Sequence, residues 1–142
     1  MANQPAPSEL IVTCPAGCDN APRKAVLKAF NVAFASGDAE ALVEQVADDI
    51  VWQVVGEGTV AGRAGFAERV NEMAYVRAVE LHLHTIITHG PTASANGLLV
   101  FPDGTRYAFC DVYQFTSAAK QGKIKRIDSY VIGLAAEDRE DK

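Results

Sequence analysis

The sequence predicts an α+β domain in which a curved, mostly antiparallel sheet of about five to six strands packs one face on three N-terminal helices. Three observations lead to this fold class. Apolar residues recur at helical spacing in the first half of the 142-residue chain, and the spacing changes to a period of two from about Ala78. The turn sequences "GP", "PDG" and "AAKQG" then divide the second half into strands. Helices therefore come first and strands last.

One domain accounts for most of the chain, with a loose segment expected at each end. Residues 1–19 contain three prolines and Gly17, which disfavour regular structure, so we expect a flexible leader there. The domain itself is expected at 20–134, followed by a polar tail at 135–142.

Three helices are predicted in the first half of the chain. The first begins with Asn20 as its N-cap and Pro22 in its first turn, and it ends at Gly37. Asp38 caps a second, shorter helix that ends before Asp48. A third follows the bends of "GEGTVAGR". The apolar stripes of the three helices are Val26, Leu27, Phe30, Ala33 and Phe34; Leu42, Val43 and Val46; and Phe66, Val70 and Met73.

Strands are predicted at 50–55, at a short stretch within "GEGTVAGR", and at four longer stretches. The first is rich in β-branched and aromatic residues. The four longer strands alternate with a period of two and span 78–89, 93–101, 106–116 and 123–132.

The strand that contains "YAFCDVYQF" raises the main question about function. Its alternation places Tyr107, Phe109, Asp111, Tyr113 and Phe115 on one face. An ordinary core would bury an unpaired carboxylate at a cost of several kcal/mol, whereas a solvent-facing surface would expose four rings. A pocket resolves this conflict, and desolvation there would raise the pKa of Asp111. The alternative is a hydrogen-bonded core acid that does no chemistry.

The composition excludes several classes of partner. Lys and Arg number 13 against 18 Asp and Glu, and the net charge of -5 gives a nucleic acid or an anionic membrane no electrostatic support. No Gly-rich phosphate loop follows a strand, so we expect neither nucleotide binding nor another cofactor. The apolar run Leu10 to Val12 is too short for a signal sequence or a membrane span. We therefore expect a cytoplasmic protein whose partner is a small apolar molecule.

Two groups of metal-ligating residues carry weaker signals. Cys14 and Cys18 lack the spacing of common redox and zinc motifs, so an arm without such a role is favoured over a redox or metal site. Glu80, His82 and His84 share one strand face, but the run is longer than comfortable coordination allows, and no metal site is expected. This face borders solvent, a subunit interface or the pocket, and in the last case a His could act as a base opposite Asp111.

Several strings, in their order and spacing, resemble the nuclear transport factor 2-like superfamily, in particular its SnoaL-like and ketosteroid isomerase-like members. They are "FASGDAEALVEQVADDIVW", where one helix ends in Gly and Asp and the next in a double Asp; "VAGRAGF", the turn into a helix; and "CDVYQF" followed by "GKIKRIDSY", the last hairpin. The likeness covers residues 20–134. It implies a cone-shaped α+β barrel with a pocket between the helices and the concave sheet, and it implies a homodimer.

The resemblance can be carried to single residues. The oxyanion-hole Asp of ketosteroid isomerases matches Asp111, whereas the position of their general-base Asp holds Val54 and that of their oxyanion-hole Tyr holds Phe30. Without a base, a hydrogen-bond donor cannot move a proton between carbons. SnoaL-like cyclases resemble the alternative in which a single Asp does the acid and base work, and Asp111 could serve there.

Two kinds of function follow from the resemblance. One is an acid/base isomerase, cyclase or lyase that acts on a small apolar carbonyl compound, with Asp111 as the central catalytic group and Tyr113 or a His assisting. The other is a ligand-binding or interaction module without turnover.

Trp52 belongs to the expected pocket lining, and a role in the core is the alternative for this residue. The expected pocket lining is Leu27, Phe30, Phe34, Trp52, Val54, Asn96, Leu98, Val100, Phe109, Ile127, Ser129 and Val131.

Overall fold

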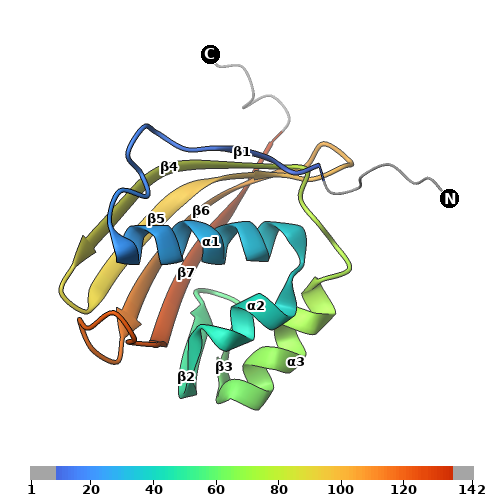
Figure 1. Cartoon of the computed structure of the whole chain (residues 1–142). Coiled ribbons are helices and arrows are strands. Elements are labelled where there is room, and N and C mark those ends of the chain that lie inside the picture. The colour runs from blue at the N-terminus through green and yellow to red at the C-terminus, as the bar shows by residue number, and fades with distance from the viewer. Residues whose placement is uncertain (1–8, 136–142) are drawn as a thin grey trace, which may run out of the picture.

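The computed structural model describes residues 9–135, which form three helices and one seven-stranded sheet (Figure 1). The predicted α+β class is confirmed. The helices are α1 (Pro22–Ser36), α2 (Ala39–Glu44) and α3 (Arg63–Met73). The strands are β1 (Ile11–Thr13), β2 (Val46–Val54), β3 (Gly58–Ala61), β4 (Glu80–His89), β5 (Thr92–Val100), β6 (Arg106–Phe115) and β7 (Ile124–Leu134).

The sheet is mixed, with the order β1-β4-β5-β6-β7-β2-β3. Strands β4 to β7 form the antiparallel meander that their period-two alternation predicted. Both of the parallel pairs, β1 with β4 and β2 with β7, join segments that are distant in the sequence. A bulge between Leu83 and Thr85 interrupts the β4–β5 ladder and bends the sheet. Gly97 lies at this bend, where a Cβ would collide with the carbonyl oxygen of His82.

Two helix ends lie where the sequence predicted them, and two do not. Gly37 ends α1 in the left-handed conformation (φ 76°), and the Asp38 side chain accepts a hydrogen bond from the backbone N–H of Ala41, as expected of an N-cap. The residue before α1 is Ala21, so the predicted Asn20 cap is wrong by one position. Helix α2 is also shorter than predicted, and Val46 starts β2 as a buried strand residue.

The N-terminal segment is built into the sheet. Ile11–Thr13 pair in parallel with the start of β4, and Cys14 and Cys18 form a disulfide bond. Leu10, Val12 and Cys14 pack against the core. The expected flexible leader is therefore wrong for this stretch, because edge pairing and a covalent loop hold it. Residues 1–8 of that leader and 136–142 of the expected tail lie outside the described residues.

The core fills the space between α1 and the concave face of the sheet. Figure 1 shows α1 crossing that face, while α2 and α3 pack beside β2 and β3. Edge-to-face ring contacts link Tyr113, Phe30, Phe34, Trp52 and Phe66, with ring centroids 5.4 to 6.1 Å apart. This aromatic chain supports one wall of the cavity described below. Within residues 9–135, none of the helices combines the length and the apolar character that crossing a bilayer requires.

Candidate functional site

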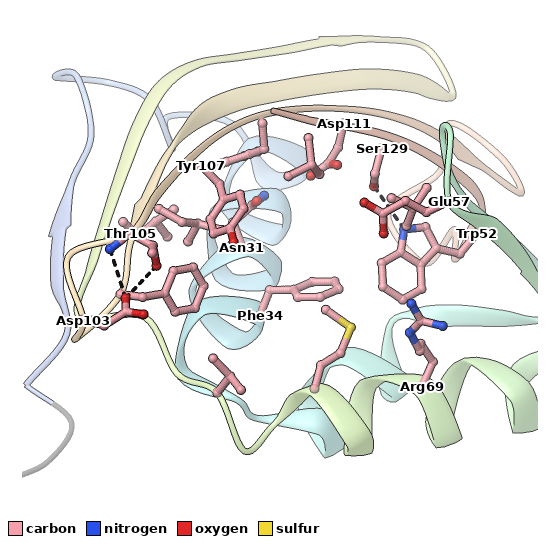
Figure 2. A pocket seen from close by; sticks show the side chains of 18 residues that line it. Asn31, Phe34, Trp52, Glu57, Arg69, Asp103, Thr105, Tyr107, Asp111 and Ser129 are labelled. Atoms are coloured by element: carbon pink, nitrogen blue, oxygen red, sulfur yellow. Dashed lines mark hydrogen bonds between the residues drawn. The ribbon is translucent and has the colours of Figure 1, made fainter. Parts of the chain in front are cut away.

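A cavity of about 490 Å³ lies between the concave face of the sheet and the helices (Figure 2). This volume falls in the range of small-molecule sites. The buried or half-buried part of its wall is mostly aromatic and aliphatic, whereas the exposed mouth contains both charged and apolar residues. The lining residues are Asn31, Phe34, Trp52, Val54, Glu57, Arg69, Met73, Val76, Leu81, Leu99, Phe101, Asp103, Thr105, Tyr107, Phe109, Asp111, Ser129 and Val131.

Strand β6 runs from the mouth of the cavity into the core. Tyr107, at the mouth, is 37% exposed, and Phe109 is buried. Asp111 comes next in the wall, and Tyr113 beyond it is only 1% exposed. The alternation of β6 therefore places the Asp111 carboxyl where the cavity meets the closed core.

Two hydrogen-bonded chains converge on the Asp111 carboxyl. In the first, the Asn31 side-chain amide donates to the Tyr113 hydroxyl (3.1 Å), which donates to Oδ2 of Asp111 (3.3 Å). In the second, Nε1 of Trp52 donates to the Ser129 hydroxyl (3.0 Å), and this hydroxyl is hydrogen-bonded to the Asp111 carboxyl. An indole N–H and an amide NH₂ can only donate, so both hydroxyls are free to point their hydrogens at Asp111.

Burial dominates the protonation of Asp111. Desolvation raises the pKa of Asp111 from 3.8 to about 6, although the hydrogen bonds from Ser129 and Tyr113 oppose the rise. Burial also raises the pKa of Tyr113 well above its ordinary value, and the nearby Asp111 charge adds to the effect. Tyr113 therefore remains a neutral donor, while Asp111 exchanges its proton near neutral pH.

The mouth of the cavity carries polar groups of a different kind. Asp103, in the turn between β5 and β6, accepts hydrogen bonds from the backbone N–H (3.0 Å) and the hydroxyl (2.7 Å) of Thr105. These bonds lower the pKa of Asp103. Glu57 and Arg69 lie on the other side of the opening, next to Trp52 (Figure 2). Asp111 is thus the cavity's deep acid, and the other charges lie at the rim.

The structure brings part of the predicted lining together. Phe34, Trp52, Val54, Phe109, Asp111, Ser129 and Val131 line the cavity. Phe30, Tyr113 and Ile127 lie in the core behind that wall, so Tyr113 touches Asp111 rather than the cavity. Leu27 is also buried in the core.

The predicted lining on β5 is wrong. Leu99 lines the cavity, so Asn96, Leu98 and Val100 do not. Asn96 and Leu98 alternate with the buried residues Ala93, Ala95 and Gly97, and they face the opposite side of the sheet. Because the residues on the inner face of β5 are small, the hydrophobicity pattern did not show which face lines the cavity.

Several lining residues were not predicted from the sequence. Asn31 had a signal, because it is a polar residue within the apolar stripe of the first helix, between Phe30 and Phe34. Leu81 and Phe101 belong to predicted strands that were not assigned to the pocket. Met73 belongs to the predicted apolar stripe of the third helix, which was not assigned to the pocket either. No periodicity marks the remaining residues, which loops and one exposed helix position contribute: Glu57, Arg69, Val76, Asp103 and Thr105.

The histidine face of β4 points away from the cavity. His82 alternates with the buried Leu81 and Leu83, and its ring nitrogens contact Oγ1 of Thr13 (2.7 Å) and Oε1 of Glu80 (2.7 Å). The alternative of a histidine base opposite Asp111 is therefore wrong for His82, and His84 is exposed and does not line the cavity either. In the part of the chain that the structure describes, no group of three or more His, Cys, Asp and Glu residues could hold a metal ion.

Comparisons with known proteins agree with this fold. Residues 26–127 match the SnoaL-like domain family. An NTF2-like protein of unknown function from Cytophaga hutchinsonii is 25% identical with a TM-score of 0.57, over 76% of this chain and 97% of the other. The epoxide hydrolase/cyclase-like enzyme SalBIII, described in pyran ring formation of the polyether salinomycin, is 19% identical with a TM-score of 0.65, over 80% and 93% of the two chains. A search of curated proteins finds no match.

The family match and the fold point to the same conclusion. The matched segment includes most of α1, the wall strands β2 and β6, and both hydrogen-bonded chains except Ser129. The structural likeness extends over most of the chain, with the NTF2-like fold that the order of elements predicted. The chain belongs to the SnoaL-like domain family.

Proposed function

We propose that the protein binds a small, largely apolar carbonyl compound in the cavity and that Asp111 exchanges a proton with it, in an isomerase, cyclase or lyase reaction. The observation that carries this proposal is a carboxyl in the wall of an aromatic cavity with its pKa raised to about 6. A general acid or base works best when its pKa is close to the working pH.

The surroundings of Asp111 suit a group that both takes and returns a proton. When ionised, Asp111 is held by the Tyr113 and Ser129 hydroxyls and accepts a proton from a carbon acid or a substrate hydroxyl. When protonated, it donates to a carbonyl, enolate or ether oxygen. Tyr113 does not line the cavity, so in this proposal it is a positioning residue for Asp111 rather than a catalytic one.

The reaction class is narrowed by the groups near Asp111. Val54 offers no titratable side chain at the cavity wall, and His82 lies on the other face of the sheet, so Asp111 acts without a second deep base. Cyclisation needs one proton removed and one delivered, which a single carboxyl can do in turn. The fold likeness to SalBIII makes cyclisation the first reaction to test.

The test compares Asp111→Asn with Asp49→Asn, an exposed strand residue outside the cavity. Native mass spectrometry of co-purified molecules identifies the ligand to assay. We expect the Asp111→Asn variant to lose about 10²- to 10⁴-fold in turnover while it keeps its fold, because it can no longer transfer a proton. The control variant should keep wild-type turnover. Full activity of Asp111→Asn would eliminate the proposal.

A second candidate is a binding module without turnover. The observation in its favour is the apolar Val54 at the cavity wall and the buried Phe30 behind it, where ketosteroid isomerases carry a base and a donor. Saturable binding of the co-purified molecule, with no product formed by the wild-type protein, would establish this function in place of the first.

We also propose a cytoplasmic homodimer. Tyr130 and Ile132 are 48% and 64% exposed on the face of β7 that alternates with the cavity-lining Ser129 and Val131, and a second copy can cover them. Analytical ultracentrifugation tests the dimer, and a monomer at micromolar concentration would contradict it.

In a reducing cytoplasm, where disulfides are rare, we expect the Cys14–Cys18 bond to be at least partly reduced on thiol titration.

A further inference from the structure

Arg69 supplies the one positive charge among the described residues that line the cavity. It extends from α3 toward the indole of Trp52 (Figure 2). Within residues 9–135, no hydrogen bond or ion pair engages its guanidinium. Arg63, on the same helix, instead donates to Asp48 and to the carbonyl of Val46. The two arginines of α3 thus differ, because Arg63 joins the helix to β2 while Arg69 has five donors left to offer.

A second, smaller cavity adjoins this end of the site. Its volume is about 100 Å³, and it is lined by Trp52, Val54, Gly58, Thr59, Val60 and Arg69. Trp52, Val54 and Arg69 also line the main cavity, so these three residues form a shared boundary. A ligand that extends from Asp111 along the indole of Trp52 therefore ends at the Arg69 guanidinium.

We propose that Arg69 binds a terminal carboxylate of the ligand, so that the substrate is an apolar carboxylic acid whose reacting atoms lie at Asp111. The inference rests on the proposed function in that it takes the cavity to be the ligand site. A guanidinium is a planar fork that matches a carboxylate in two parallel hydrogen bonds. Phe34, Trp52 and Phe109 supply the apolar surface between the two polar ends.

The charges of the site also orient such a ligand. Above its pKa of about 6, Asp111 repels a carboxylate, so the acid end is driven toward Arg69 and the neutral end toward Asp111. Glu57 lies on the same side of the cavity as Arg69 and forms no ion pair with it in the described structure. The negative charge of Glu57 therefore weakens binding of an anion, and removing it should have the opposite effect to removing the charge of Arg69.

The experiment uses decanoate and its uncharged methyl ester as probes. Trp52 is the single tryptophan of the chain, so its fluorescence reports occupancy at the boundary between the cavities. At about pH 7.5, where the acid is ionised, we expect decanoate to bind the wild-type protein more tightly than the ester does. Arg69→Gln should weaken decanoate binding about tenfold and leave ester binding unchanged. Arg69→Lys should lose less, because it keeps the charge without the fork.

Two further variants control for charge. Lys120→Gln removes one positive charge from the exposed β6–β7 loop and should change neither affinity. Glu57→Gln should tighten decanoate binding and leave ester binding as it was. Equal losses for both probes in Arg69→Gln, the same loss in Lys120→Gln, or no saturable decanoate binding would overturn the inference. None of these measurements involves turnover. A negative result for Arg69 is therefore distinguishable from a negative result of the Asp111→Asn assay.

Discussion

Asp103 and Asp111 line the same cavity, but their pKa values are shifted in opposite directions. Asp103 lies at the exposed mouth, in a turn, and two hydrogen bonds from Thr105 lower its pKa. Asp111 lies in the deep wall on β6, where it also accepts hydrogen bonds, yet burial raises its pKa to about 6. Hydrogen bonding is common to both sites, so the difference comes from access to water.

The two sites also differ in how they are built. The partners of Asp103 come from a residue two positions along the chain, within one turn. Of the two direct partners of Asp111, Tyr113 is also two positions along the chain, but Ser129 comes from β7. The hydroxyls of both partners are in turn held by Asn31 and Trp52, which lie about eighty and sixty residues from Asp111 in other elements. A local arrangement produces an ordinary ionised carboxylate, whereas the tertiary arrangement produces a group suited to proton transfer.

The largest expected effect is on the pH dependence of stability. The folded protein keeps the Asp111 proton up to about pH 6, whereas the unfolded chain releases it near 3.8. The stabilisation by this proton is thus fully present below 3.8 and is lost as the pH rises through about 6. Relative to wild type, Asp111→Asn should therefore gain about 3 kcal/mol in the free energy of unfolding between about pH 3.5 and pH 8.

Urea unfolding of both proteins at the two pH values measures this gain, and comparison with wild type cancels the other titrating groups. Asp103→Asn provides the contrast. Since its pKa is lowered in the folded protein, its stabilising effect is present above the unfolded pKa and lost as the pH falls, so its pH dependence should have the opposite sign. The same sign in both variants would break the comparison.

A smaller effect is expected from the second layer around Asp111. Tyr113→Phe removes one donor to the carboxylate, so the pKa of Asp111 should rise further, by about one unit. Carbon-13 NMR titration of the aspartate carboxyl resonances measures it, with the Asp103 resonance as an internal reference. An unchanged or lowered pKa of Asp111 would show that Tyr113 does not hold the ionised form.

The smallest effect is expected at the mouth. Thr105→Val removes the hydroxyl that donates to Asp103 but keeps the backbone donor, so the pKa of Asp103 should rise part of the way to its ordinary value. The same NMR titration should show no change at Asp111. A shift at Asp111 as well would mean that the two acids are coupled through the cavity.

The features that could be predicted from the sequence are those that depend on neighbouring residues. Strands β4 to β7 were predicted to within two residues at each end, because alternation and turn residues define them locally. The cavity face of β6 was also predictable, since an acid that alternates with four rings favours a pocket wall over solvent or a closed core. The cavity face of β5 was not, because Ala93, Ala95 and Gly97 face inward while Leu98 faces outward.

The sequence by itself determined the order of helices and strands, the caps at Gly37 and Asp38, and the strand face that carries Asp111, because each depends on neighbours within a few residues. The tertiary structure alone decided that β1 joins the sheet edge, that Tyr113 lies behind Asp111, and that Arg69 reaches the cavity. These depend on which distant segments pack together, and long-range packing leaves no periodic trace in a single sequence.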